Sequence, residues 1–388
     1  MTTTPESIDP GYTGLRTKVE SLPTQYYFDE AHYERELERI WYRNWICLGR
    51  SSSVSEPRAY QVFDLGSQQI LVVRGDDKRL RAFHNTCRHR GSVLCSNETG
   101  RFPGGRITCP YHSWIYDLDG NLLRTTSLTQ AEGFSPEDYS LYGVAIEEFA
   151  GFVFVRLEGD RGPSVEESID GYTGRLEQWP LGDMVVGHTF RRVVQCNWKV
   201  VWENYGECLH CPNIHPTLSK LVPLFARGLQ EQTDDPHWQA HAQDDDPKYH
   251  GGLRDGAKTW SMDGQVHGKP IATLSEDARR AGQSFADCWP SAYFHGHLDY
   301  AHVTFMRPLG PEQTEYTKIC LFPKETLEDD NFPLANVVDF VKKVVEEDLG
   351  ICEQTQKGMR SRRHEAGVIM PEEYYLKDFQ DWVRRQLD

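Results

Sequence analysis

The stretches Cys87-Arg88-His89 and Cys109-Pro110-Tyr111-His112 decide how the first half of this chain folds. Each stretch carries one Cys and one His, so together they supply two thiolates and two imidazoles. Around them the chain alternates short apolar runs with Gly, Asp and Asn, a pattern typical of short β-strands joined by turns. Both stretches fall between such runs. The pattern therefore predicts a small β domain, residues 45–160, that presents four metal ligands on two loops.

Two thiolates and two imidazoles fit two kinds of metal centre. If each loop gives its Cys to one iron and its His to the other, the set matches a Rieske 2Fe-2S centre. Neutral imidazoles raise the potential of such a cluster relative to one held by four anionic thiolates. The same set also satisfies a tetrahedral structural zinc ion, although zinc loops more often keep both Cys on one loop. Cys87, His89, Cys109 and His112 are candidate ligands on either interpretation.

A second group of metal-binding residues surrounds His210. Glu203, Glu207 and His210 are spaced by four and three residues, which would place them on one face of a helix. His215 would lie about 140° away from His210 on an ideal helix, so the helix is expected to be distorted, with Pro212 as the cause. Two imidazoles that gain one carboxylate make an open non-haem iron site. Taken alone, the pair is better explained as two satisfied polar residues in a core.

The missing carboxylate is expected from a long C-terminal helix over residues 334–359. Its valines form one apolar stripe at about 100° per residue. Asp348 falls in the middle of that stripe, whereas Glu346 lies nearly opposite and Glu347 points to the flank. A carboxylate on the inward face is costly unless it is paired or bound to a cation. Asp348 is therefore predicted to be the third iron ligand beside the two histidines.

Length and composition suggest two domains and exclude some functions. A chain of 388 residues is long enough for two domains. No apolar run reaches the length of a membrane helix, and residues 1–11 lack the pattern of a secretory signal, so a cytoplasmic protein is expected. The net charge of −16 argues against a nucleic-acid partner, because phosphate binding needs a basic surface.

The cysteines outside the two metal loops are expected to be reduced. Disulfides are rare in the cytoplasm, and free Cys is among the most buried residue types. All of these side chains are predicted to be small buried hydrophobic groups: Cys47, Cys95, Cys196, Cys208, Cys211, Cys288, Cys320 and Cys352.

Periodicity divides the chain into three segments. Residues 1–44 are expected to form a helical segment that packs on the C-terminal domain, with one amphipathic helix over residues 29–47. Residues 161–388 mix strands with long helices, as in a larger α+β domain. Within them, residues 230–268 are rich in Asp, His and Gly, which favours either a lid over the active site or a plain insertion.

Taken together, the CxH and CxxH loops, the acid at 207, the two histidines and a C-terminal acid resemble the terminal oxygenase component of Rieske non-haem iron oxygenases. The likeness covers about residues 41–386. It implies an α+β fold, with an N-terminal all-β Rieske domain and a C-terminal helix-grip domain, an antiparallel sheet with long helices. It also implies a homotrimer, because the two metals of one protomer are too far apart for fast electron transfer. His112 would then face Glu207 of the adjacent protomer.

The acid at position 207 is typical of one branch of that family. Many ring-hydroxylating members carry Asp where this chain has Glu207. Glu207, with the phrases Asn204-Tyr205-Gly206-Glu207-Cys208-Leu209-His210-Cys211-Pro212 and His215-Pro216, is similar to oxygenases of glycine betaine, stachydrine and carnitine. The resemblance implies a small quaternary ammonium substrate. Aromatic residues could form a cation–π cage for it, although core packing explains them equally well: Trp238, Trp260, Trp289, Tyr293 and Phe294.

The resemblance further implies an oxygenase that receives NAD(P)H electrons through a separate flavin/iron-sulfur reductase, because the chain has no GxGxxG dinucleotide loop. Electrons would pass from the cluster through His112 and Glu207 to the iron, and O₂ would serve to hydroxylate the substrate. Hydroxylation of an N-methyl group would release formaldehyde. Mono- or dioxygenation of an aromatic ring or acid is the enzymatic alternative. An electron carrier or structural zinc protein is the non-enzymatic one, and it requires His210, His215 and Asp348 to be accidental.

Overall fold

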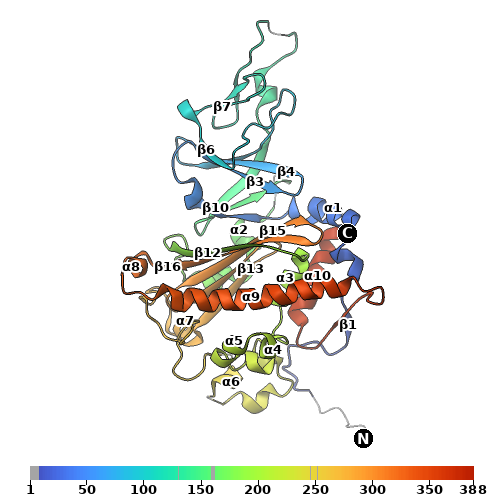
Figure 1. Cartoon of the computed structure of the whole chain (residues 1–388), viewed down its shortest axis with the longest axis vertical. Coiled ribbons are helices and arrows are strands. Elements are labelled where there is room, and N and C mark those ends of the chain that lie inside the picture. Colours follow the sequence, from blue (N-terminus) through green and yellow to red (C-terminus); the bar gives the residue numbers. More distant parts are fainter. Residues whose placement is uncertain (1–7, 130, 159–161, 245, 251) are drawn as a thin grey trace. The chain divides into compact units, whose positions relative to one another are not determined.

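The computed structural model describes residues 8–129, 131–158, 162–244, 246–250 and 252–388 (Figure 1). The chain divides into two compact units. The first, here called the β unit, comprises residues 37–170 and 288–292. The second, here called the helix–sheet unit, comprises the residues up to Glu36, residues 171–287 and residues 293–388. The predicted α+β class, with an all-β domain ahead of a domain of antiparallel sheet and long helices, is confirmed.

The β unit is built from antiparallel strands. Its larger sheet has the order β2-β11-β10-β5-β4-β3-β6, and a smaller sheet has the order β7-β8-β9. The apolar runs of β4 and β11 are buried on both faces, since every side chain from residue 70 to 74 and from residue 152 to 156 is buried. The strands are β2 (Ile46–Arg50), β3 (Ala59–Leu65), β4 (Gln68–Arg74), β5 (Leu80–His84), β6 (Thr99–Arg101), β7 (Ile107–Thr108), β8 (Ile115–Tyr116), β9 (Leu122–Arg124), β10 (Gly143–Phe149) and β11 (Phe152–Arg156).

The core of the β unit reaches the two metal loops. Cys87 and Cys109 belong to the same buried cluster as Leu71, Phe83 and Trp114. The loops are therefore fixed by the packing of the sheets beneath them. Short helical segments complete the unit: η2 (Leu37–Trp41), η3 (Ser51–Val54), η4 (Pro103–Gly105), η5 (Pro136–Tyr139) and α2 (Val165–Ser168).

The helix–sheet unit has one antiparallel sheet in the order β12-β16-β15-β14-β13. The strands are β12 (Val185–Val194), β13 (Gln283–Cys288), β14 (Ala292–His297), β15 (Ala301–Gly310) and β16 (Gln313–Phe322), and β1 (Val19–Glu20) pairs separately with β17 (Val368–Ile369). The register of β15 and β16 places Thr304 opposite Lys318 and His302 opposite Cys320. Because paired residues share a face, these four side chains lie on one side of the sheet.

Helix α9 (Leu334–Met359) runs along this sheet and contacts α3 (Trp198–Tyr205), α4 (Cys211–Ile214) and β12 (Figure 1). Its bounds match the predicted helix, and its apolar stripe, including Val337, Val345 and Cys352, is buried. No helix of the described residues is long and apolar enough to cross a membrane. The remaining helices of the unit are η1 (Thr24–Tyr27), α1 (Glu30–Glu36), η6 (Tyr172–Leu176), α5 (Pro216–Leu221), η7 (Phe225–Arg227), η8 (Gln232–Asp234), η9 (Trp238–His241), α6 (Pro247–His250), α7 (Glu276–Ala281), α8 (Lys324–Leu327) and α10 (Tyr374–Leu387).

The predicted single helix over residues 29–47 is wrong at its C-terminal end. Helix α1 continues only through one π-helical turn that ends at Trp41, and strand β2 begins at Ile46. The side-chain amide of Asn44 donates a hydrogen bond of 2.8 Å to the carbonyl of Ile40. The same carbonyl also accepts the backbone N–H of Asn44 at 3.1 Å, so Asn44 closes the last turn with both its backbone and its side chain before the chain enters β2.

The described positions of residues 230–268 contain only short helical pieces, η8, η9 and α6, in keeping with their weak periodicity. Positions 245 and 251 lie outside the described residues. Whether this segment closes over the active site stays a prediction.

Candidate functional site

The two loops of the β unit have the same backbone geometry. In each loop the carbonyl of the Cys accepts a hydrogen bond of 3.0 Å from the N–H four residues along, which belongs to Gly91 after Cys87 and to Ser113 after Cys109. The N–H of each Cys also donates to the carbonyl five residues along, at 2.8 Å in both loops. Gly91 (φ 71°) and Ser113 (φ 54°) are both left-handed, which turns each loop back. The loops therefore present their Cys and His in equivalent positions.

The candidate ligands on these loops differ in exposure. Cys87 and Cys109 are buried, His112 is half-buried and His89 is exposed. The rings of His89 and His112 lie 4.7 Å apart, and Trp114 stacks on His89 at 4.8 Å. Burial raises the pKa of the Cys87 thiol, so a bound metal is what would hold it as a thiolate. The imidazoles thus form the outer edge of the site and the sulfur atoms its floor.

The spacing of these four side chains argues against a single zinc ion. Ligand atoms around tetrahedral zinc lie about 3.3–3.8 Å apart. Among the described residues, triads of possible ligands whose atoms all lie within 4.8 Å of one another occur only in the helix–sheet unit. No three of Cys87, His89, Cys109 and His112 converge in this way. Ligands spread over two metal positions are what a two-iron cluster needs.

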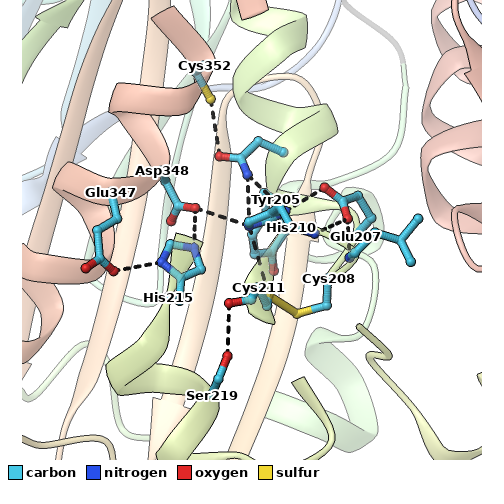
Figure 2. Close-up of polar contacts among 12 residues, drawn as sticks. Tyr205, Glu207, Cys208, His210, Cys211, His215, Ser219, Glu347, Asp348 and Cys352 are labelled. Carbon is cyan, nitrogen blue, oxygen red and sulfur yellow. Dashed lines mark hydrogen bonds and ion pairs between the residues drawn. A yellow bond between two sulfur atoms is a disulfide. The ribbon is translucent and has the colours of Figure 1, made fainter. Parts of the chain in front are cut away.

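The second predicted ligand set converges. The ligand atoms of His210, His215 and Asp348 lie within 4.8 Å of one another (Figure 2). Asp348 Oδ1 lies 2.7 Å from His215 Nε2 and 3.4 Å from His210 Nε2. His215 is almost fully buried, and Asp348 is partly exposed. Two imidazoles and one carboxylate that point at one position fit an iron ion with coordination sites left free.

Electrostatics in this site favour a bound cation. Burial alone would lower the pKa of His210, but its hydrogen bonds with Asp348 and Glu207 outweigh burial and raise the pKa to about 9. Burial would raise the pKa of Asp348, yet the bonds to both histidines bring it down to about 2. In the metal-free protein a proton on His210 therefore partly balances the carboxylates. A divalent cation can take its place.

The local chain path differs from the predicted one. Helix α3 ends at Tyr205, so Glu207 and His210 do not continue its face. His210 precedes α4, and His215 separates α4 from α5, with Pro212 in the first turn of α4. The predicted distortion at Pro212 is therefore wrong, because proline is well tolerated in a first helical turn and the break occurs earlier, at Gly206. The non-helical stretch is what lets both histidines face Asp348.

A carboxylate holds each histidine from its far side. Glu347 Oε2 lies 2.9 Å from His215 Nδ1, and Glu207 Oε1 lies 2.5 Å from His210 Nδ1 (Figure 2). Such partners fix the ring orientation and leave Nε2 for the metal. Glu207 also accepts the backbone N–H groups of Leu209 and His210. The acid predicted as the bridge between metal sites is thus a rigid part of the His210 loop.

Two of the cysteines predicted to be free thiols are joined. Cys208 and Cys211 form a disulfide around Leu209 and His210 (Figure 2). Their Cα atoms lie 4.9 Å apart, within the range that a disulfide spans. The prediction of free thiols at these two positions is wrong, because the chain turn after Gly206 brings them together. Every cysteine named in that prediction is buried, as expected.

Helix α3 is fixed by buried polar contacts from both ends of the chain. Lys199 and Glu36 form an ion pair at 2.5 Å, and both side chains are 0% exposed. Glu203, predicted to share a face with the metal ligands, instead accepts hydrogen bonds from Tyr27 and Gln380. Burial raises the pKa of Glu203 to about 7. Removing one partner from this network would cost several kcal/mol, so α3 and the loop after it are held in one position.

A second histidine group was not visible in the sequence. His295 and His297 on β14, His302 on β15 and Lys318 on β16 are all buried. One ring nitrogen from each histidine lies within 4.8 Å of the others. Lys318 Nζ lies 3.5 Å from His302 Nδ1. The signal that could have found the group is a run of polar residues at every second position of a buried strand, Tyr293, His295 and His297.

The five aromatic residues proposed as a cage do not gather at one place. Trp260 and Tyr293 both contact the ring of His295, at 6.2 and 5.7 Å. Phe294 follows Tyr293 on β14 and therefore points to the opposite face of the sheet. Trp238 lies in η9 against Gly11, and Trp289 belongs to the β unit.

Paired loops for a two-iron cluster and a two-histidine, one-carboxylate iron site define an oxygenase that carries its own electron-relay centre. The chain belongs to the ring-hydroxylating alpha-subunit family of Rieske oxygenases. The family model described as the catalytic domain of the ring hydroxylating alpha subunit matches residues 181–388, and the Rieske [2Fe-2S] domain matches residues 44–135.

Curated relatives match over nearly the full chain. A carnitine monooxygenase oxygenase subunit of Escherichia coli (strain K12) is 30% identical over 357 residues, which cover 90% of this chain and 87% of the relative. A glycine betaine monooxygenase oxygenase subunit of Chromohalobacter salexigens is 28% identical, and the match covers 93% of this chain and 84% of the relative. The crystal structure of the quaternary ammonium Rieske monooxygenase CntA with L-carnitine matches with a TM-score of 0.69, 25% identity and 96% coverage of both chains.

The chain is therefore the terminal oxygenase subunit of a multicomponent system. It carries a Rieske 2Fe-2S cluster and a catalytic non-haem iron, and its electrons come from a separate reductase. The predicted family and enzyme class are confirmed. The alternatives of a stand-alone electron carrier and of a structural zinc protein are wrong.

Proposed function

We propose that this oxygenase subunit hydroxylates a small quaternary ammonium or betaine compound at an N-methyl group. The names of the relatives support this substrate class, since they include carnitine and glycine betaine monooxygenases. One atom of O₂ enters the C–H bond of the methyl group, and the other leaves as water with two electrons from NAD(P)H and two protons. The hydroxymethyl group then breaks its C–N bond, which gives formaldehyde and the demethylated amine.

The metal-binding residues follow from the geometry described above. Cys87 and Cys109 would hold one iron of the cluster, and His89 and His112 the other. His210, His215 and Asp348 would hold the mononuclear iron. When bound there, that iron supplies the activation of O₂ at its free positions. The convergence of these three side chains is the observation that carries the proposal.

The protein's own groups orient the iron ligands. Glu347 and Glu207 accept the Nδ1–H groups of His215 and His210, which leaves each Nε2 unprotonated and aimed at the metal position. The hydrogen bonds from Leu209 N–H and His210 N–H hold the Glu207 carboxylate against the loop. A rotation of either ring would break two contacts at once.

We place the working protein as a homotrimer in which electrons cross between protomers, from His112 of one to Glu207 of its neighbour. Inter-subunit electron transfer is named for the related quaternary ammonium monooxygenase. The outer position of His112 and the fixed position of Glu207 support such a path. We take residues 45–160 as the Rieske domain and residues 161–388 as the iron domain. The cytoplasmic location stays a prediction.

Turnover with a purified reductase tests the substrate class. The iron-loaded protein, a generic reductase, NADH and O₂ would be combined with glycine betaine, carnitine, stachydrine or choline, or with an aromatic acid. Formaldehyde formed in proportion to NADH and to the substrate consumed is the expected result. A hydroxylated aromatic product without formaldehyde would keep the iron chemistry and overturn the proposed substrate.

A further inference from the structure

The group formed by His295, His297, His302 and Lys318, here called the imidazole–lysine cluster, holds a buried positive charge that no carboxylate of the described residues contacts. Lys318 is 7% exposed, and its hydrogen-bond partner within the described residues is the neutral ring of His302. No carboxylate oxygen of those residues lies within ion-pair distance of Lys318 Nζ. Lys318 Nζ lies 5.4 Å from the centroid of the Tyr293 ring, which is a weak cation–π contact. A buried ammonium without a carboxylate partner is costly, so this arrangement destabilises the free protein.

Several polar atoms around Lys318 also lack partners. Neither ring nitrogen of His297 has a hydrogen-bond partner in the described structure, and neither has Nδ1 of His295. The indole N–H of Trp260 is buried without a partner as well, and its ring lies 5.1 Å from that of His297. Buried polar groups are normally satisfied. Their concentration at one place indicates that another molecule satisfies them.

The charge of the cluster selects between two kinds of ligand. Three imidazoles this close together could hold a metal ion. The Lys318 ammonium opposes that, because it repels a cation and occupies the Nδ1 lone pair of His302. Burial, with the charge of Lys318, lowers the pKa of all three histidines, that of His297 to about 3. The histidines are therefore neutral and can offer N–H groups beside one positive charge, which suits an anion.

The cluster lies in the same interior as the iron site. The negative charge of Asp348 acts on Lys318, where it partly offsets the lowering of the pKa to about 8 by burial. Tyr205 is the last residue of α3. Its hydroxyl group shares a hydrogen bond of 3.2 Å with His295 Nε2, and its ring stacks on that of Tyr293 with the centroids 4.0 Å apart. A substrate with its reacting end at the iron could thus place its other end at the cluster.

We infer that the imidazole–lysine cluster binds the carboxylate of the substrate, so the substrate is a zwitterion with a quaternary ammonium group and a carboxylate. This inference rests on the proposed function and narrows it. A carboxylate at Lys318 would pair the buried ammonium and accept the free N–H groups of the cluster. A cation without a carboxylate, such as choline, would instead meet an uncompensated positive charge, and the cluster would reject it.

Calorimetric titration of the metal-loaded protein without O₂ tests this directly. Glycine betaine, carnitine and stachydrine would each be compared with the matching primary amide, which keeps the shape and removes the charge. Choline, benzoate and benzamide complete the set. At least one betaine is expected to bind about ten- to a hundredfold tighter than its amide, the range for hydrogen bonds to charged groups.

Lys318→Met is the decisive variant. The variant should bind the acid no more tightly than the amide, while its affinity for the amide equals that of the parent. Comparing the two ligands in the two proteins is a double-mutant cycle, which isolates the interaction between Lys318 and the carboxylate. The melting temperature of the variant should be equal to or above that of the parent, since an unpaired buried charge is removed. Lys342→Met, an exposed lysine paired with Glu346, is the control of equal charge. His297→Leu is the second variant and should weaken the acid preference as well.

The outcomes separate this inference from the proposed function. Equal binding of acid and amide, equal loss of both in Lys318→Met, or no binding by any compound would overturn the carboxylate site. Benzoate that binds and loses affinity in Lys318→Met, with no binding by quaternary ammonium compounds, would keep the site and overturn the proposed substrate. A further divalent metal per chain that His297→Leu removes, with the other metals retained, would make the cluster a metal site instead.

Discussion

Two groups of histidines lie in the helix–sheet unit, and their surroundings give them opposite properties. His210 and His215 each contact two carboxylates, and the pKa of both is raised, that of His210 to about 9. The imidazole–lysine cluster has a lysine in place of the carboxylates, and burial together with that lysine lowers the pKa of its histidines. The first group therefore attracts a cation, and the second suits an anion.

The difference shows that converging histidines do not by themselves identify a metal site. Both groups satisfy the same distance criterion of 4.8 Å. What separates them is the sign of the nearest fixed charge, Asp348 in one case and Lys318 in the other. Changing Asp348 or Lys318 should therefore abolish cation binding at the first group or replace anion binding by cation binding at the second.

Asp348→Asn should have the largest effect. It removes a proposed iron ligand and the carboxylate that pairs with His215, so iron at this site and turnover should fall by more than about a hundredfold, beyond the loss typical of an outer partner. Metal analysis and the visible spectrum would measure the two centres separately, and the cluster signal should persist. Glu346→Gln, on the exposed side of the same helix, is the control. Full iron occupancy in Asp348→Asn would contradict the assignment.

Lys318→Glu should make the imidazole–lysine cluster bind a metal ion, as the site of His210 and His215 is proposed to do. Three imidazoles beside a carboxylate are a good site for zinc, so the variant should bind one more equivalent of Zn²⁺ than the parent. It should also lose about a hundredfold in affinity for any carboxylate ligand, because attraction becomes repulsion. Equilibrium dialysis with zinc checks the gain, with Lys342→Glu as the control. Unchanged zinc binding would show that the lysine does not decide the sign of this site.

Glu347→Gln should weaken the first group without abolishing it. Glu347 contacts His215 Nδ1 and not the metal position itself, and loss of such an outer partner typically costs about ten- to a hundredfold in metal affinity. Competition with a chelator measures this affinity. Glu346→Gln should behave as the parent. If Glu347→Gln lost iron as completely as Asp348→Asn, Glu347 would itself be a ligand.

The pH dependence of the metal-free protein should show the smallest effect, of a few degrees in melting temperature. The raised pKa of His210 contributes stability that is complete below its unfolded value of 6.5 and is lost as pH rises through about 9. The lowered pKa of His297 contributes stability that is complete above 6.5 and is lost as pH falls toward about 3. The combined contribution of these two histidines to stability should therefore be largest near pH 6.5.

Two variants test which histidine causes the loss of stability at each end of the pH range. Scanning calorimetry would measure their melting temperatures as a function of pH. Asp348→Asn removes the partner that raises the pKa of His210, so the loss of stability at alkaline pH should become shallower. In His297→Gln the loss of stability at acidic pH should become shallower. The lowered pKa of Asp348, about 2, adds a further loss of stability only once pH falls below its unfolded value of 3.8, at the acid end of this window. Variants that shift the whole profile equally would contradict the assignment.

The sequence predicted best the features that depend on residues close together in the chain. The two loops of the β unit could be read directly, since a Cys and a His two or three residues apart must share a loop. Asp348 could also be predicted, because a carboxylate in the apolar stripe of a regular helix needs a cation or a partner to offset its burial. The first case rests on short spacing and the second on the periodicity of a regular helix, and the structure preserves both.

Prediction failed where tertiary contacts override periodicity. The spacing of Glu203, Glu207 and His210 indicated one helix, but that helix ends at Tyr205, and Glu203 turns to Tyr27 and Gln380 instead. The Cys208–Cys211 disulfide depends on that same break. The imidazole–lysine cluster joins three strands whose register is not visible in the sequence.

The helix–sheet unit is formed by segments that are far apart in the sequence, and this has a consequence for biosynthesis. Helix α3, which precedes the His210 loop, is held by Glu36 before the β unit and by Gln380 in the last helix of the chain. Synthesis proceeds at about 5–20 residues per second, and domains generally fold as units. The β unit, nearly all within residues 37–170, can close early on the ribosome. The iron pocket must wait for α10, so iron–sulfur insertion can precede iron loading in each newly made chain.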